Sequence, residues 1–185
     1  HFYNSMGTEV TIVEFMPNVV PVEDEDISKQ MERSLKKAGI KIMTNSSVER
    51  IDTTGSGVKA FVKTAKGEEV LEADILLSAV GIKTNIENIG LEEVGIATDK
   101  DKILVNAYNQ TNIPGYYAIG DVTPGQALAH VASAEGINCV EKIAGLHVEP
   151  IDYGNVPGCT YATTKKKNIK IKKKQAKEKG YELKI

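Results

Sequence analysis

Cysteine is scarce in this 185-residue sequence, and long apolar runs are missing from it. The two cysteines, Cys139 and Cys159, form no CxxC or similarly close pair, so they offer neither a disulfide framework nor the ligand spacing of a metal site. No apolar run approaches the roughly 20 residues of a membrane span, and no signal segment opens the chain. We therefore expect a cytoplasmic globular protein with no metal and no membrane partner.

Charge is unevenly distributed along the chain. The total is −2, yet residues 165–185 hold ten Lys against two Glu, which leaves about −10 on the residues before them. A basic tail of this kind can bind nucleic acid or an acidic partner. Because this one contains no Arg, we predict a solvated surface and no nucleic-acid partner. A non-catalytic binding module whose basic tail holds a partner is the alternative.

Residues 1–42 predict a strand, a helix and a second strand in that order. The opening "HFYNSMG" is typical of the last turns of a helix closed by Gly7, and "TEVTIVEF" alternates like a strand and ends at Glu14. In "PVEDEDISKQMERSLKKAGIKI", acidic residues crowd the start, apolar residues recur at helical spacing, and Gly39 ends the helix. This order indicates a βαβ unit.

The rest of the chain predicts a β-meander followed by a strand and a helix. Short alternating runs separated by glycine turns extend to Gly81, and the last of them predicts a buried strand at residues 75–80. After a polar passage, "YYAIGDV" predicts a strand over residues 116–122. An apolar-striped helix is predicted from about Ala127 to the cap at Gly145.

Glu14 is the first candidate binding residue. A carboxylate that closes the second strand of a dinucleotide-binding fold accepts hydrogen bonds from the adenosine ribose and repels a 2′-phosphate, which favours NAD over NADP. The accompanying GxGxxG turn belongs about 20 residues earlier, so we expect the first strand and that turn to lie outside this chain. "TTGSGVKA" is no substitute, because Gly55 and Gly57 fall where a hairpin turn is needed.

A second candidate site follows from "YYAIGDV" and the helix behind it. Gly120 permits close approach of the backbone, Asp121 can accept from sugar or ribitol hydroxyls, and the start of the helix turns free N–H groups toward an electron-rich ligand. His130 lies one turn into that helix. A lone helical histidine is more often packed or solvated than catalytic.

Four ordered blocks carry a resemblance to a known family. "VTIVEFMPNVVPVEDEDISKQMERSLKKAGIKI", "ADILLSAVGIKTNIENIGLE", "YYAIGDV" with "LAHVASAEG", and "VPGCTY" together resemble the dihydrolipoamide dehydrogenase family of flavin-dependent pyridine nucleotide–disulfide oxidoreductases. The resemblance runs from His1 to about Tyr161 and weakly on to "QAKEKGYELKI". Glutathione and mercuric reductases remain alternatives within the same group, although Glu14 disfavours those that use NADP.

The resemblance implies roles for individual residues. On the NAD side, Glu14 matches the acidic residue on the adenosine ribose, Val48 an adenine contact, and Gly81 the glycine beside the nicotinamide. On the FAD side, the matching residues are Gly120, Asp121, Leu128, Ala129 and His130, with Asp121 on the ribitol and the "LAH" run beside the flavin ring. No catalytic residue is expected here, since the family's redox disulfide and its His–Glu base match no part of this chain.

The fold class expected from these patterns and the resemblance is α/β. It comprises a truncated dinucleotide-binding (Rossmann-like) domain with a β-meander over residues 1–85, a returning segment of an FAD-binding domain over 86–148, and the start of an α+β dimerisation domain over 149–185. Thr164, Lys165 and Lys170 depart from the family's pattern in that last part.

The function implied is that of an internal fragment, inactive alone, of an enzyme that reoxidises protein-bound dihydrolipoamide through a redox disulfide and FAD to reduce NAD. The intact enzyme is expected to be a homodimer. Its partners would be a 2-oxo acid dehydrogenase complex or the glycine cleavage lipoyl protein.

Overall fold

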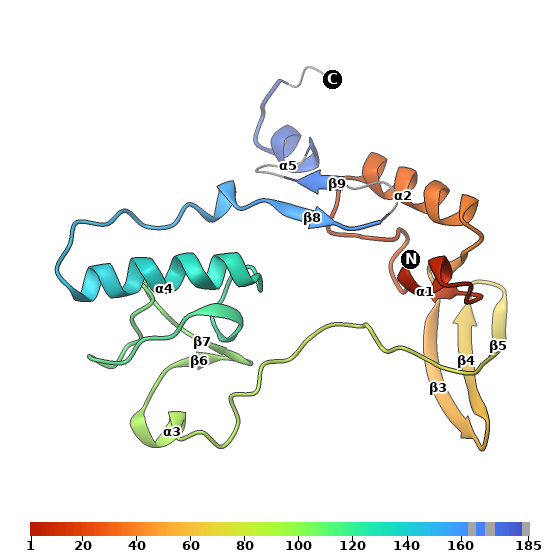
Figure 1. Cartoon of the computed structure of the whole chain (residues 1–185), viewed down its shortest axis with the longest axis horizontal. Coiled ribbons are helices and arrows are strands. Elements are labelled where there is room, and N and C mark those ends of the chain that lie inside the picture. The colour runs from red at the N-terminus through yellow and green to blue at the C-terminus, as the bar shows by residue number, and fades with distance from the viewer. Residues whose placement is uncertain (163–165, 169–172, 183–185) are drawn as a thin grey trace. The chain divides into compact units, whose positions relative to one another are not determined.

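The computed structural model describes residues 1–162, 166–168 and 173–182 (Figure 1). The chain divides into two compact units. The first unit comprises residues 1–78 and 157–185, and the second comprises residues 79–156. The three-domain boundaries expected from the sequence stay a prediction, and Thr164, Lys165 and Lys170 lie outside the described residues.

A parallel βαβ arrangement opens the first unit, as predicted. Its elements are α1 (Phe2–Ser5), β1 (Thr11–Val13), α2 (Glu25–Lys37) and β2 (Lys41–Met43). β1 pairs with β2 in parallel, with Ile12 opposite Ile42. Gly7 and Gly39 follow α1 and α2 with φ of +93° and +88°, the left-handed conformation that glycine adopts without strain.

The charge pattern of α2 explains where this helix begins and ends. Glu25 and Asp26 lie in its first turn and Lys36 and Lys37 in its last, so both ends carry the charges that the helix dipole favours. Met31, on its inner face, is almost fully buried. The helix is therefore amphipathic, with one apolar side against the rest of the unit.

Three antiparallel strands form the predicted meander, in the order β3 (Ser47–Thr54), β4 (Gly57–Thr64) and β5 (Gly67–Ala73) (Figure 1). The central strand β4 contributes the buried side chains of Ala60 and Val62. Gly57 begins β4 opposite Thr54, and a Cβ at Gly57 would stand 2.6 Å from the carbonyl oxygen of Ala73. The glycines of "TTGSG" therefore serve a hairpin, as predicted.

The buried strand expected at residues 75–80 does not form. Ile75, Leu77 and Val80 are 85%, 73% and 97% exposed, and none of the described strands pairs with this segment. A strand that is to be buried needs neighbours for its backbone N–H and C=O groups. The prediction of a buried strand at residues 75–80 is therefore wrong.

The second unit holds mostly short elements around one long helix. They are α3 (Leu91–Val94), β6 (Thr98–Asp99), β7 (Lys102–Ile103), η1 (Gly120–Val122), α4 (Ala129–Ile143) and η2 (Tyr153–Asn155). Ile86, Leu91 and Ile103 form a small core, and Val122 packs against it. This core brings the end of "YYAIGDV" next to the β6–β7 hairpin.

The predicted strand over residues 116–122 is also wrong. Only an isolated bridge joins Tyr117 to Gln110, and Gly120–Val122 form the 3₁₀ turn η1 instead of a strand end. Tyr116 and Ile119 are exposed on this segment. The pairing at this bridge consists of two backbone hydrogen bonds of 2.9 Å, from Thr111 N–H to the Tyr116 carbonyl and from Ala118 N–H to the Asn109 carbonyl. A strand needs a longer ladder than this single bridge.

α4 is the predicted apolar-striped helix, shifted by two residues at its start. Leu128 remains extended, with φ −134° and ψ 132°, so the helix begins at Ala129 and not at Ala127. At 15 residues it is the longest helix described, and no helix in the described part is long and apolar enough to cross a membrane. Its C-terminus is followed by Gly145 at φ +78°, the predicted cap.

Three elements near the C-terminus belong to the first unit. β8 (Gly158–Thr160) pairs antiparallel with β9 (Lys166–Asn168), and α5 (Lys173–Glu178) follows. Ala176 of α5 is buried.

Candidate functional site

Glu14 lies at the carboxyl end of β1, where the parallel pair of strands ends. Its backbone N–H donates to the carbonyl of Met43 at 2.8 Å, and its own carbonyl accepts from Ser46 N–H at 3.0 Å. One carboxylate oxygen, Oε1, accepts from the backbone N–H of Met16 at 2.8 Å. The half-buried side chain is therefore held in place through one oxygen, while Oε2 has no partner among the described residues.

Val48 and Gly81 are the other two predicted residues of the NAD side. Val48 lies on β3, 40% exposed, beside an irregularity in register between Val48 and Arg50. Gly81 has φ +135°, and a Cβ added to it would meet no atom within 4 Å. It belongs to the second unit, whereas Glu14 and Val48 belong to the first. Each residue is thus accessible to a ligand in its own unit.

A tight turn at Gly120 forms the centre of the FAD-side candidate site. Gly120 has φ +76°, and a Cβ there would lie 3.3 Å from Cβ of Ala132 on α4. Its carbonyl accepts from Thr123 twice, from N–H at 2.9 Å and from Oγ1 at 2.8 Å. Both the conformation and the close approach to α4 favour glycine at this position.

Asp121, the next residue, offers an exposed carboxylate at this turn. Its backbone carbonyl accepts a hydrogen bond of 2.5 Å from Nζ of Lys102. Its carboxylate accepts no hydrogen bond from the described residues. The turn therefore presents an acceptor that is free for a hydroxyl-bearing ligand.

Leu128, Ala129 and His130 form the start of α4. The carbonyl of Leu128 accepts from Val131 and Ala132 N–H, both at 3.0 Å, and no side chain caps this end. The N–H groups of the first helical turn have no partner within a helix, so those of Ala129 and His130 are available to a ligand. The imidazole of His130 is exposed. The turn that precedes Asp121 packs against the same helix, since a Cβ at Gly120 would lie 3.3 Å from Cβ of Ala132.

A buried carboxylate that sequence reasoning missed lies beneath the Gly120 turn. Glu135 on α4 is 2% exposed, and its Oε2 accepts from the N–H of Gly120 at 2.7 Å. Its Oε1 accepts from the hydroxyl of Tyr153 at 2.8 Å. Burial, followed by the hydrogen bond to Glu135, raises the pKa of Tyr153 to about 12. The signal in the sequence was a lone acidic residue inside the apolar stripe "VASAEGIN".

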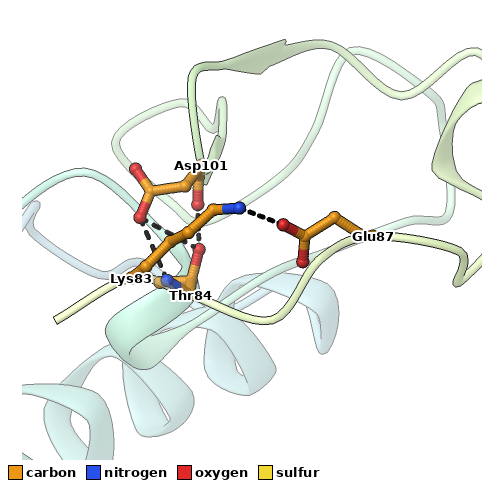
Figure 2. A network of polar contacts seen from close by, with 4 residues as sticks. All are labelled: Lys83, Thr84, Glu87 and Asp101. Carbon is orange, nitrogen blue, oxygen red and sulfur yellow. Dashed lines mark hydrogen bonds and ion pairs between the residues drawn. The ribbon is translucent and has the colours of Figure 1, made fainter.

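A second polar network fixes the chain just after Gly81. Figure 2 shows Thr84 meeting Asp101, with Thr84 N–H donating to Oδ2 at 3.0 Å and Thr84 Oγ1 donating to the Asp101 carbonyl. Lys83 pairs with Glu87 beside them. The hydrogen bond from Thr84 N–H is the main cause that lowers the pKa of Asp101. These contacts tie the segment to the β6–β7 hairpin.

The two cysteines are free thiols. Cys139 is buried on α4, where burial raises the pKa of its thiol, and Cys159 is half-buried on β8. A thiol whose pKa is raised is a poor nucleophile at neutral pH. Cys139 therefore suits a packing role.

Comparison with known proteins shows the family. Residues 1–136 match the family described as pyridine nucleotide-disulphide oxidoreductase. The chain is 44% identical over its whole length to a dihydrolipoyl dehydrogenase of Rhizobium etli and covers 39% of that protein. It is 41% identical over 99% of its length to a mitochondrial dihydrolipoyl dehydrogenase of Pisum sativum and covers 37% of it. The predicted resemblance is confirmed.

Solved structures agree with the sequence relatives. The chain superposes on the crystal structure of LpdA from Mycobacterium tuberculosis with a TM-score of 0.87 at 26% identity, covering 96% of the chain and 38% of that protein. The flavoprotein disulfide reductase RclA of Escherichia coli, which is induced by HOCl, gives 0.85 at 26% identity, with 95% and 40% covered. The chain thus spans about two fifths of the length of these proteins, and the expected truncated Rossmann-like fold class is confirmed.

Cofactor use follows from the family. The dihydrolipoyl dehydrogenases of this family, to which the chain is similar, use FAD and NAD. The family match covers both the segment of Glu14 and the turn of Gly120 and Asp121. The chain belongs to the pyridine nucleotide-disulphide oxidoreductase family.

Proposed function

We propose that this chain is part of a dihydrolipoamide dehydrogenase. The intact enzyme would oxidise the two thiols of protein-bound dihydrolipoamide to a disulfide and pass the electrons through its own disulfide and FAD to NAD. The observation that carries the proposal is 44% identity along the whole chain to a protein of that name. Glu14 adds specificity, since a carboxylate at that position is compatible with NAD and repels the 2′-phosphate of NADP.

The FAD contacts proposed for this chain lie at the Gly120 turn and the start of α4. FAD carries ribitol hydroxyls and an electron-rich ring system. The unpartnered Asp121 carboxylate suits the hydroxyls as an acceptor, and the free N–H groups of Ala129 and His130 suit electron-rich atoms as donors. The chemistry of these donors and this acceptor therefore fits the FAD roles proposed for Gly120, Asp121, Leu128, Ala129 and His130.

The NAD contacts proposed are those of Glu14, Val48 and Gly81. Glu14 is held by Met16 through Oε1, which leaves Oε2 for a ribose hydroxyl. Val48 offers an apolar surface for an adenine ring. Gly81 has no side chain to obstruct a nicotinamide. FAD and NAD, when bound, supply the hydride chemistry, and the residues of this chain bind and orient them.

The partners and location proposed rest on the same relatives. A homodimer that serves a 2-oxo acid dehydrogenase complex or the glycine cleavage lipoyl protein is the expected assembly. A cytoplasmic location stays a prediction, because the matched relatives include proteins named as mitochondrial.

The direct test uses the intact protein that contains this chain. Purified protein is assayed for NADH formation from dihydrolipoamide and NAD, and separately for NADP reduction and for bound flavin by absorbance. Flavin-dependent NADH formation, well above NADPH formation, supports the proposal. If the protein binds flavin and reduces other disulfides but does not use dihydrolipoamide, it belongs with the other disulfide reductases of the family. A protein that binds no flavin would favour the non-catalytic binding module.

A further inference from the structure

Glu135 is buried, yet both oxygens of its carboxylate accept hydrogen bonds. Oε2 accepts from the backbone N–H of Gly120 at 2.7 Å, and Oε1 accepts from the Tyr153 hydroxyl at 2.8 Å. The two donors come from segments that lie 15 and 18 residues from Glu135 in sequence. A carboxylate that is shielded from water destabilises the fold unless hydrogen-bond donors replace the water. The N–H of Gly120 and the hydroxyl of Tyr153 supply those donors to Glu135.

Tyr153 is able to keep its donor role across the physiological pH range. Burial and Glu135 raise the pKa of its hydroxyl to about 12, so the phenol stays protonated near neutral pH. Tyr153 also approaches the start of the loop before α4, since its carbonyl accepts from the Gln126 amide at 3.4 Å. Its ring lies 3.7 Å from where a Cβ on Gly125 would stand.

The backbone of the Gly120 turn is almost fully engaged by the protein. The Gly120 N–H donates to the Glu135 carboxylate, and the Gly120 carbonyl accepts from the Thr123 hydroxyl. The Asp121 carbonyl accepts from the Lys102 ammonium group. The peptide that carries Asp121 is thus fixed on both sides. The carboxylate of Asp121 is the acceptor that the turn leaves for a ligand.

We propose that Glu135, with Tyr153 as its second donor, is a positioning residue for Asp121. By holding the N–H of Gly120, Glu135 keeps that residue at positive φ and fixes the place of the next side chain, the proposed acceptor for the hydroxyls of FAD. This inference rests on the proposed function, and it adds residues that touch no cofactor themselves. Tyr153 extends the support to the loop before α4.

The test compares substitutions in the intact protein, with FAD removed and added back. Glu135→Ala removes the acceptor, whereas Glu135→Gln keeps an oxygen for Gly120 N–H and an NH₂ group that can donate to the Tyr153 oxygen. Tyr153→Phe removes the hydroxyl alone. Exposed Glu141 on the same helix, substituted to Gln, is the matched control.

Three measurements are made on each variant: the dissociation constant of FAD from flavin fluorescence quenching, the visible spectrum of the bound flavin, and thermal unfolding of the apoprotein. We expect Glu135→Ala to weaken FAD binding at least tenfold and to shift the flavin band. Glu135→Gln should restore most of the affinity. That rescue should fail in the Glu135→Gln/Tyr153→Phe double variant, whose amide NH₂ then lacks its acceptor.

The outcomes separate this inference from the proposed function. Unmodified protein that binds no FAD overturns the proposed function and the positioning role with it. Unmodified protein that binds FAD, with Glu135→Ala equal to the Glu141→Gln control, overturns the positioning role alone. So does a loss of affinity that follows apoprotein unfolding in every variant, with no spectral change and no rescue by Gln, because it would show a purely structural residue.

Discussion

The side-chain ammonium group of Lys102 donates a hydrogen bond of 2.5 Å to the backbone carbonyl of Asp121. Lys102 lies on β7 and Asp121 in η1, so this bond connects the β6–β7 hairpin to the turn proposed to bind FAD. It leaves the Asp121 carboxylate unoccupied while placing a positive charge near it. The hairpin therefore holds the turn at the Asp121 carbonyl, while Glu135 holds it at the Gly120 N–H.

Substituting Lys102 tests this support. Lys102→Met in the intact protein should weaken FAD binding about five- to thirtyfold, because a hydrogen bond from a charged donor, roughly 1–2 kcal/mol, is lost. Lys102→Arg, which retains a charged donor, should bind FAD more tightly than Lys102→Met. The control is Lys100→Met in the same hairpin, where the exposed Lys100 makes no such bond. Equal FAD affinity in Lys102→Met and Lys100→Met would refute the role.

The Thr84–Asp101 contact predicts a pH-dependent contribution to stability. The pKa of Asp101 is lowered below its ordinary value of 3.8, first by the hydrogen bond from Thr84 N–H. A carboxyl whose folded pKa is depressed stabilises the fold above the unfolded pKa, and that contribution is lost as the pH falls through the folded pKa. The stability advantage over Asp101→Asn should thus be constant above about pH 5 and disappear in stronger acid.

Urea unfolding of the intact protein and of Asp101→Asn across this range measures the difference. Asp99→Asn, on the exposed side of the same hairpin, provides the control and should show a smaller dependence on pH. A difference between the protein and Asp101→Asn that grows toward low pH would contradict the assigned sign.

Short-range signals in the sequence were sufficient for the helices and the meander. The acidic start of α2, its apolar spacing and Gly39 at its end all act within a few residues of one another. The meander was equally predictable, because the glycines of "TTGSG" separate two alternating runs and the hairpin turn lies between Thr54 and Gly57. Such signals predict an element when the interactions that form it are local.

Partner-dependent features were not predictable in the same way. The apolar runs at 75–80 and 116–122 indicate strands, but a strand exists only where another pairs with it, and the described residues provide no ladder for either. At the site, Gly120 was predictable from the sequence, because a glycine directly after the apolar run "YYAI" indicates a close turn of the backbone. Glu135 was missed because its donors, Gly120 N–H and Tyr153, are distant in sequence and a helical Glu is usually exposed.

The isolated 185-residue chain should not reduce NAD with dihydrolipoamide. Both of its cysteines are free, and neither lies in a close pair that could exchange with the substrate. The assay follows NADH absorbance with dihydrolipoamide, NAD and added FAD, with the intact protein as the positive reference. Turnover by the chain approaching that of the intact protein would show that a reacting group has been overlooked.

Asp121 should be needed for FAD retention. Asp121→Ala in the intact protein removes the proposed acceptor for ribitol hydroxyls, at a cost of about 1–3 kcal/mol, or roughly five- to 150-fold in affinity. The isolated chain, which supplies only these contacts, should bind FAD weakly or not at all. Flavin fluorescence titration measures both, with Asp99→Ala as the exposed control. Tight binding of FAD by Asp121→Ala would remove Asp121 from the site.

Glu14 is expected to select NAD over NADP. The hydrogen bond from Met16 N–H to Oε1 holds the carboxylate at the end of β1, so the charge is fixed where an adenosine ribose would approach. A fixed carboxylate favours NAD in two ways: it accepts from ribose hydroxyls, and it repels the 2′-phosphate of NADP. Glu14→Ala removes both effects.

In the intact protein, Glu14→Ala should therefore lower the ratio of kcat/KM for NAD to that for NADP at least tenfold. The lost hydrogen bonds contribute about 1.5–3 kcal/mol to NAD, and NADP gains from the relief of repulsion. Steady-state kinetics with each nucleotide provide the ratio, and Glu9→Ala, exposed just before β1, is the control for a general loss of negative charge. Because both terms act on the nucleotide alone, KM for dihydrolipoamide should stay the same. An unchanged NAD to NADP ratio in Glu14→Ala would assign the ribose contact to another residue.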